Sequence, residues 1–131
     1  LLEDFGKSRE FFLTVVSNRL SQQMRLRKSF EFKEVKERGM RFRDNALWVQ
    51  GYVDESIDHS KVGIIATKRL GGAVQRNLAK RRIRELFRQS QYLIKPGSHI
   101  VVLPRTDSLS LPFGELQKRF LKLIGKTFIK R

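Results

Sequence analysis

Cationic side chains gather between residues 68 and 88, and they are the residues of this sequence best suited to bind a partner. Glu85 is the single acidic residue in the stretch. A guanidinium group donates hydrogen bonds in parallel pairs, which suits the oxygens of a phosphate. The stretch therefore predicts a phosphate-binding surface, and its eight cations are Lys68, Arg69, Arg76, Lys80, Arg81, Arg82, Arg84 and Arg88.

A helix from Ala73 to about Gln91 would sort these side chains by face. Its apolar face holds Ala79, Ile83, Leu86 and Phe87. Its opposite face holds Asn77, Lys80, Arg81, Arg84 and Arg88, with Arg76 at the boundary. A solvated helix face is the plain alternative, but such faces usually mix opposite charges four residues apart. We therefore expect this face to bind nucleic acid, with Asn77 able to reach sugar or base edges.

A second candidate surface comes from residues 46–53, where Trp48, Gln50 and Tyr52 share one side of a predicted strand. Phe32, on a predicted first helix, is placed to join them. Exposed aromatic rings beside cations stack unpaired bases. Burial under a helix is the commoner arrangement, so the pattern favours a core position for Tyr52 and leaves Trp48 open.

Signatures of catalysis by the protein itself are missing. The sequence has no cysteine, which removes thiolate nucleophiles, disulfides and cysteine-based zinc sites. His59 and His99 stand far apart without ligand spacing, and the carboxylates gather mainly between Asp54 and Asp58. We therefore predict no catalytic residue and no metal site in this chain.

Composition fits one folded, nucleic-acid-binding domain. The chain has 131 residues, 40% of them hydrophobic, and a formal net charge of +15. Such a charge favours polyanionic partners. No apolar run approaches the length of a membrane helix, and the start of the sequence lacks the positive charge of a signal peptide, so we expect a cytoplasmic protein without membrane contact.

The expected elements alternate between helix and strand. A helix from a Ser29 cap to about Arg38 precedes strands at 46–53 and 61–68, which we expect to pair as an antiparallel hairpin. The long basic helix, a buried strand at 100–103 and a helix from Pro112 through Phe128 complete the chain. This order predicts an α+β two-layer sandwich over residues 24–131, preceded by an extension over 1–23 that has helical spacing.

The segment KRLGGAVQRNLAKRRIRELFR (68–88) resembles the signature of the bacterial ribonuclease P protein subunit, whose Arg-Asn-Arg motif runs approximately RNRxKRxxRExFR. Similar segments appear in the same order as in that family: LRKSFEFKEVKERG (26–39), VGIIATKR (62–69) and HIVVLPR (99–105). The resemblance covers residues 24–131. The motif positions that match are Arg76, Asn77, Lys80, Arg81, Arg84, Glu85, Phe87 and Arg88.

The resemblance implies an αβββαβα fold similar to a ribosomal-protein domain, with a left-handed strand–helix–strand crossover that the usual handedness rule would not predict. It also implies two partners, a catalytic RNA that holds Mg²⁺ and cleaves, and precursor tRNA, whose 5′ leader is removed. No obligate protein partner and no cofactor bound by the protein alone are implied. The implied RNA-binding residues are Lys68, Arg69, Arg76, Asn77, Lys80, Arg81, Arg84 and Arg88, and those of the leader cleft are Phe32, Trp48 and Gln50.

Three residues depart from the family pattern. Leu78 stands where a second motif arginine is common, and Lys36 and Gln50 stand where cleft aromatics often occur. The runner-up function is a structural RNA-binding protein of the ribosome or its assembly. A DNA-binding regulator is disfavoured because no helix-turn-helix pair is evident.

Overall fold

A four-stranded sheet with three α-helices forms the protein, as a computed structural model shows for residues 25–26, 28–125 and 127–130. The predicted extension over 1–23 lies outside the described residues. The αβββαβα order and the α+β class are confirmed. The elements are α1 (Ser29–Arg38), β1 (Met40–Arg43), β2 (Leu47–Val53), β3 (Lys61–Ile64), η4 (Lys68–Leu70), α2 (Ala73–Ser90), η5 (Gln91–Leu93), β4 (Ser98–Pro104), η6 (Thr106–Leu109) and α3 (Phe113–Ile124).

The strands lie in the order β1-β2-β4-β3. β2 pairs antiparallel with both β1 and β4, whereas β3 pairs with β4 in parallel. The predicted hairpin between 46–53 and 61–68 is therefore wrong, because β4 lies between these two strands. All seven residues of β4 are buried, and a strand that is apolar on both faces gains most from a central place in the sheet.

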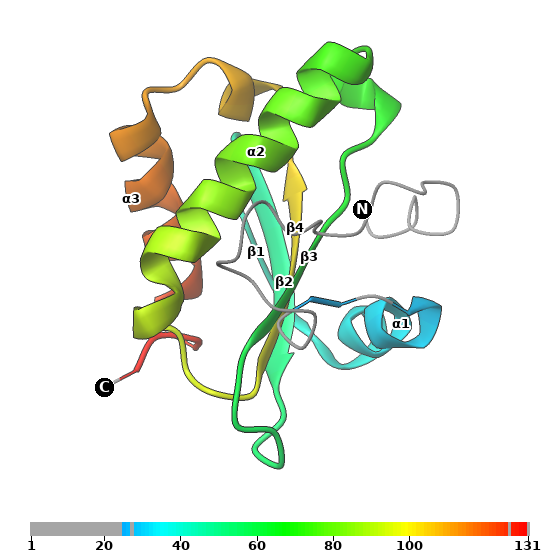
Figure 1. Ribbon diagram of the computed structural model, residues 1–131, viewed down its shortest axis with the longest axis vertical. Coiled ribbons are helices and arrows are strands. Elements are labelled where there is room, and N and C mark those ends of the chain that lie inside the picture. Colours follow the sequence, from blue (N-terminus) through cyan, green and yellow to red (C-terminus); the bar gives the residue numbers. More distant parts are fainter. Residues whose placement is uncertain (1–24, 27, 126, 131) are drawn as a thin grey trace.

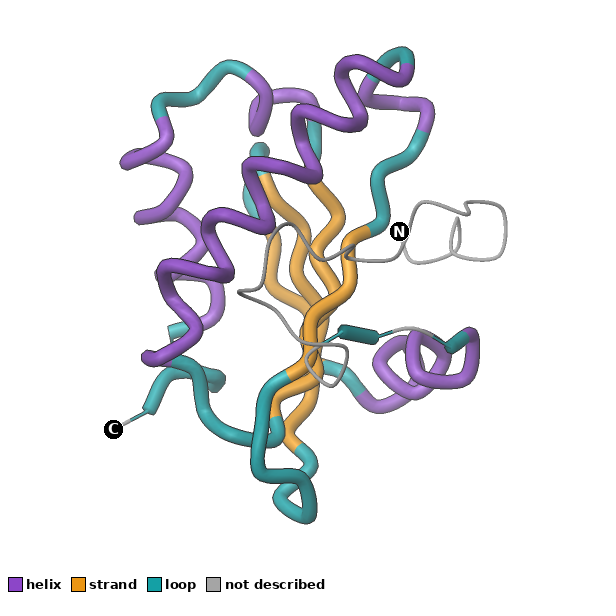
Figure 2. The backbone as a smooth tube through the Cα atoms, viewed as in Figure 1, coloured by secondary structure: helices purple, strands orange, loops and turns teal. Residues whose placement is uncertain are grey.

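Helices cover both faces of the sheet (Figures 1 and 2). α2 and α3 cover one face, and this helical layer and the sheet are the two layers of the predicted sandwich. α1 lies across the opposite face. Alternate residues of β4 divide between two clusters, Ile100 and Val102 toward α2 and α3, and Val101 and Leu103 toward α1. Within the described ranges, no helix is long and apolar enough to cross a bilayer.

α1 is fixed to the sheet by one ring and one amide. The Phe32 ring is 1% exposed and lies directly on Gly63, where a β-carbon would collide with it. The Gln50 side chain donates to the carbonyls of Lys36 (3.1 Å) and Gly39 (3.3 Å) at the end of the helix. These contacts set the position of α1 over the middle of the sheet.

The ends of two helices differ from the sequence-based expectation. Lys28, not Ser29, occupies the N-cap of α1, and the Glu31 carboxylate accepts a hydrogen bond from the Lys28 backbone at 3.0 Å. α3 ends at Ile124, and Phe128 lies beyond it as a buried residue of the main core. Phe128 packs edge-on against Phe42 of β1, with ring centroids 6.3 Å apart.

We expect Gly63→Ala to lower the free energy of unfolding by about 1 to 3 kcal/mol, because the added methyl group overpacks the site that the Phe32 ring fills. Urea unfolding monitored by circular dichroism measures this. Gly114→Ala in α3 is the matched control, since a β-carbon there meets no atom within 4 Å, and it should be neutral or stabilising by up to about 1 kcal/mol. Equal stability of the two variants would contradict the proposed packing of α1.

Candidate nucleic-acid interface

α2 presents the predicted cationic face. Ala79, Ile83, Leu86 and Phe87 are buried as expected, so the helix is oriented by its apolar stripe and the opposite side turns outward. Asn77 and Arg81 are exposed, and Arg76, Lys80 and Arg84 are partly exposed. The helix begins after Gly72, whose backbone N–H donates to the Gln75 side chain at 3.0 Å. With Arg88, six of the predicted RNA-binding side chains thus share one helix.

Arg84 is the most unusual cation of this face. Its Nε atom is buried and has no hydrogen-bond partner among the described residues. Burial lowers the pKa of Arg84, and the neighbouring Arg81 charge lowers it further. A phosphate would supply both the missing acceptor and the missing negative charge. The surroundings of Arg84 therefore favour an anionic ligand.

Arg88 has a carboxylate partner on its own helix. Its Nε donates to Glu85 at 2.9 Å, and its Nη2 donates to the other oxygen of the same carboxylate. These hydrogen bonds raise the pKa of Arg88. Much of its charge is balanced within α2, so an RNA phosphate would have to compete with Glu85 for Arg88.

Lys68 and Arg69 lie in the turn η4 between β3 and α2, and both are exposed. The turn closes at Gly71, whose φ of 126° lies in the region that favours glycine. The Arg76 side chain donates to the Gly71 carbonyl at 3.2 Å. The turn therefore brings the two exposed cations next to the first turn of the cationic helix.

The three residues predicted for the leader cleft occupy different environments. Phe32 and Gln50 are each 1% exposed and hold α1 to the sheet. Trp48 is partly exposed and packs against the smaller core cluster. Of the three, Trp48 is thus the residue with accessible surface, while any contact of Phe32 or Gln50 with RNA remains a prediction.

Two arginines that sequence reasoning missed lie over the Trp48 ring. The guanidinium carbon of Arg105 is 4.4 Å from the ring centroid, and that of Arg43 is 5.3 Å away. Arg43 is directly opposite Trp48 in the β1–β2 register, and Arg105 follows the last residue of β4. The alternating arginines of MRFR (40–43) could have indicated Arg43 as a neighbour of Trp48, but only if the pairing of β1 with β2 had been known.

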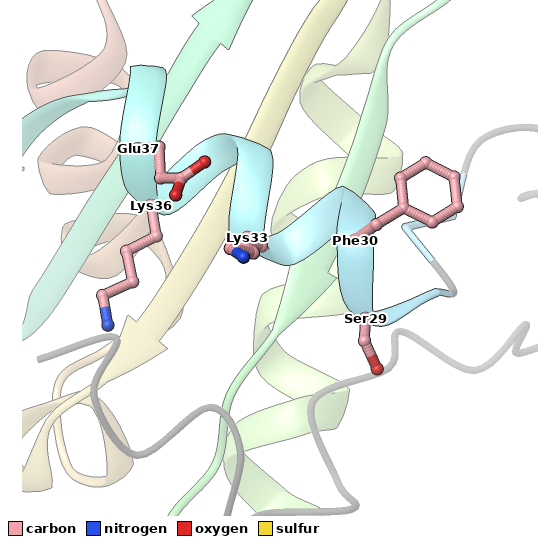
Figure 3. Close-up of a pocket in the computed structure, with 5 residues that line it drawn as sticks. All are labelled: Ser29, Phe30, Lys33, Lys36 and Glu37. Atoms are coloured by element: carbon pink, nitrogen blue, oxygen red, sulfur yellow. The ribbon is translucent and has the colours of Figure 1, made fainter.

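A pocket of about 470 Å³ lies along the outer side of α1 (Figure 3). Lys36, which stands where the family often has a cleft aromatic, lines it and not the buried side of the helix. The lining residues among those described are Ser29, Phe30, Lys33, Lys36 and Glu37. Phe30 is 62% exposed, so the aromatic residue two positions before Phe32 points away from the sheet.

A third feature of the α1 face is the buried imidazole of His99. Its Nδ1 lies 2.9 Å from the Tyr52 hydroxyl, and its Nε2 has no partner among the described residues. Burial lowers the pKa of His99, and the nearby Lys61 charge adds to this effect. Tyr52 is packed between His99 and the Arg38 guanidinium, which lies 4.3 Å from the ring centroid. Tyr52 is partly exposed and packs against the smaller core cluster as Trp48 does, so it lies at the edge of the core and not within it.

Fold and surface together define a class: an α+β nucleic-acid-binding protein that presents a cationic helix on one face of its sheet. Within the described parts of the chain, no group of three or more histidine and acidic side chains is arranged to hold a metal ion. The candidate interface therefore consists of cationic side chains, amide side chains and one tryptophan.

Comparison with known proteins names the family. The family model for Ribonuclease P matches residues 20–127. A ribonuclease P protein component from Petrotoga mobilis is 34% identical over 106 residues, covering 78% of this chain and 89% of that protein. The component from Clostridioides difficile is 33% identical over 105 residues, with 79% and 91% covered.

Solved structures agree with the sequence comparison. The ribonuclease P protein from Staphylococcus aureus superimposes with a TM-score of 0.69 at 28% identity, covering 79% of this chain and 95% of that chain. The Thermotoga maritima protein, solved with 1-(4-fluorophenyl)-2-thiourea, gives 0.69 at 28% identity, with 77% and 97% covered. The chain belongs to the ribonuclease P protein family. It is thus a protein component of an endoribonuclease in which RNA performs catalysis, and the ribosomal alternative is not favoured.

We expect the stability of the protein to fall as the pH drops below about 6.5. His99 has a lowered pKa in the folded state, so below its ordinary value of about 6.5 the unfolded chain takes up a proton that the folded chain does not. Urea unfolding at about pH 7.5 and about pH 5 measures the loss. His99→Gln should reduce this pH dependence, and His59→Gln, in the loop before β3, should retain it. The same pH dependence in His99→Gln and wild type would contradict this account.

Proposed function

We propose that the cationic face of α2 binds the catalytic RNA of ribonuclease P. The observation that carries this proposal is Arg84, a partly buried guanidinium with an unsatisfied Nε and a neighbouring cation, Arg81. Such a group is stabilised by a phosphate more than by water. The contact set on α2 is Arg76, Asn77, Lys80, Arg81 and Arg84, with Lys68 and Arg69 at its edge and Arg88 restrained by Glu85.

The 5′ leader of precursor tRNA is the second proposed ligand, bound at the end of the sheet that carries Trp48. Trp48 lies opposite Leu103 in the β2–β4 register, and Ile65, just after β3, donates its backbone N–H to Val102 at 3.0 Å. The segment from Ile65 to Arg69 therefore leaves the sheet at the Trp48 end. A single strand leaving the catalytic RNA near η4 would pass this surface.

In this proposal the protein supplies positive charge and position, and the RNA supplies the chemistry. Cations between two polyanions reduce their repulsion and release counterions, which raises substrate affinity and lowers the concentration of Mg²⁺ that the reaction needs. The Mg²⁺ ions are proposed to be held by the RNA, in keeping with the scattered carboxylates of the described residues. Precursor tRNA as substrate fits a cytoplasmic location.

Removing two cations of α2 should impair assembly with the catalytic RNA. For Arg76→Ala combined with Arg84→Ala, we expect the Kd to rise roughly 10- to 100-fold, because each loses a hydrogen bond between charged groups. Filter binding or a mobility shift with the cognate RNA measures this. The control is Lys118→Ala with Lys122→Ala, which removes the same charge from exposed positions on α3. Equal weakening by both double variants would show that only net charge matters.

Trp48→Ala should selectively weaken binding of precursor tRNA to the reconstituted holoenzyme. The expected loss for precursor tRNA is roughly tenfold in Kd, because the variant removes the ring on which the Arg43 and Arg105 guanidinium groups lie. Mature tRNA lacks the leader and should bind as it does to wild type. Equal losses for the two substrates would count against leader binding at this end of the sheet.

A further inference from the structure

Arg43, Trp48 and Arg105 form a row across three neighbouring strands. β1 supplies Arg43, β2 supplies Trp48 and the residue after β4 supplies Arg105, with both guanidinium groups over the indole ring. Arg43 and Arg105 form no ion pair with any of the described residues. A guanidinium stacked on a ring keeps its N–H donors at the edge of its plane, where they point outward. The row therefore holds two sets of N–H donors, suited to phosphate oxygens, at fixed positions.

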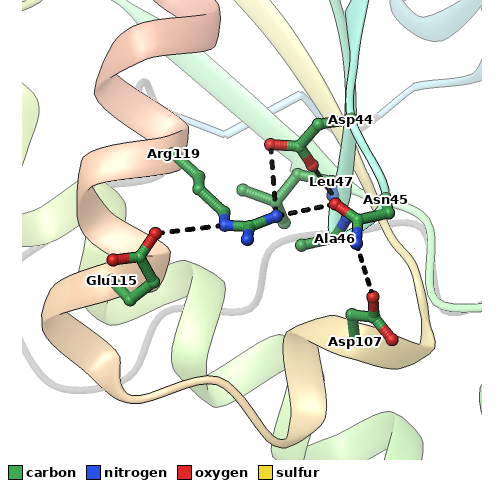
Figure 4. Close-up of polar contacts among 7 residues, drawn as sticks. All are labelled: Asp44, Asn45, Ala46, Leu47, Asp107, Glu115 and Arg119. Atoms are coloured by element: carbon green, nitrogen blue, oxygen red, sulfur yellow. Dashed lines mark hydrogen bonds and ion pairs between the residues drawn. The ribbon is translucent and has the colours of Figure 1, made fainter.

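The carboxylates closest in sequence to these arginines are engaged elsewhere (Figure 4). Asp44 accepts hydrogen bonds from the backbone N–H groups of Ala46 (2.7 Å) and Leu47 (2.9 Å). Its other oxygen lies 3.9 Å from the Arg119 guanidinium of α3. The acid that follows Arg43 is thus held by the β1–β2 turn and α3.

The carboxylate nearest in sequence to Arg105 belongs to the same network of hydrogen bonds. Asp107, two residues after Arg105, accepts a hydrogen bond from the Asn45 amide at 2.8 Å. The Asn45 carbonyl oxygen in turn accepts from Arg119 at 2.7 Å, and Arg119 also donates to Glu115 at 3.4 Å. Arg119 therefore pairs with Asp44 and Glu115, while Asn45 holds Asp107, and none of these three carboxylates forms an ion pair with Arg43 or Arg105.

Another stacked pair in the protein shows the difference. Arg38 lies over the Tyr52 ring at 4.3 Å, but its guanidinium also lies 3.5 Å from the Glu34 carboxylate. Stacking on an aromatic ring is common to all three arginines. The absence of a nearby carboxylate partner, within the described part of the chain, distinguishes Arg43 and Arg105 from Arg38.

We infer that Arg43 and Arg105 together bind one backbone phosphate of a single-stranded RNA, with Trp48 as the platform that holds both guanidinium groups. The inference rests on the proposed function, since the single strand is the 5′ leader. A base can reach the Trp48 ring only in competition with the two guanidinium groups that already lie over it. The site consequently recognises the leader by its backbone and not by base stacking.

The test uses the holoenzyme reconstituted with its cognate catalytic RNA and precursor tRNAs altered at single leader positions. One series replaces one phosphate at a time with an uncharged methylphosphonate, and the other removes one base at a time. We expect one or two methylphosphonate positions to weaken binding about tenfold, and removal of the adjoining bases to have little effect. In Arg43→Gln with Arg105→Gln, precursor affinity should fall by a similar factor and the sensitivity to those linkages should disappear.

Arg38→Gln is the matched control, because it removes a stacked guanidinium that already has a carboxylate partner, and it should keep the wild-type pattern. Three results would overturn the inference: no sensitive linkage in wild type, a sensitive linkage that persists in the double variant, or loss on base removal that the double variant abolishes. If wild type binds precursor and mature tRNA equally, leader binding itself fails and this inference fails with it. If wild type favours precursor but no linkage is sensitive, only the phosphate site fails.

Discussion

Thirteen carboxylate side chains face 28 lysines and arginines in this sequence, and the placement of the carboxylates determines where positive charge stays unbalanced. Several acids are paired at positions away from the cationic face of α2. These pairs are Glu31–Lys61, Glu34–Arg38, Asp44–Arg119 and Glu115–Arg119. Glu85 is the exception on α2, and it is occupied by Arg88. On the same face Arg81 lies close enough to Arg84 to lower the pKa of that guanidinium, and an RNA backbone would reduce this repulsion.

The sheet separates the two proposed RNA surfaces while keeping them in fixed relation. α2 is anchored on one face by its apolar stripe, and α1 is anchored on the other by Phe32 on Gly63 and by the Gln50 amide. The turn η4 connects β3 to α2 at the end of the sheet where Trp48 lies. Since both anchors are buried in rigid elements, cations on α2 and the Trp48 row can contact two parts of one RNA assembly at the same time.

Local patterns predicted the helices and their faces well, because helical spacing alone decides which side chains of α2 are buried. Strand pairing could not be predicted in the same way. Residues 46–53 and 61–68 are adjacent in sequence, yet β4 separates them, since pairing depends on which strand can be covered on both faces. The same limit hid the surroundings of Trp48. Arg43 and Arg105 approach its ring only after β1 and β4 have taken their places beside β2.

Burial was the other property that residue type did not reveal. The Phe32 and Gln50 side chains, predicted for the leader cleft, are both buried where α1 meets the sheet, and they fix the helix there. The most direct test of the central claim is the affinity of the protein for its catalytic RNA as a function of salt concentration. Four cations of α2, together with Lys68 and Arg69 at its edge, would neutralise four to six phosphates, which predicts that log K falls with log salt at a slope of about −3 to −5. A slope near zero, or one that is unchanged when Arg76, Lys80 and Arg84 are replaced, would contradict the account.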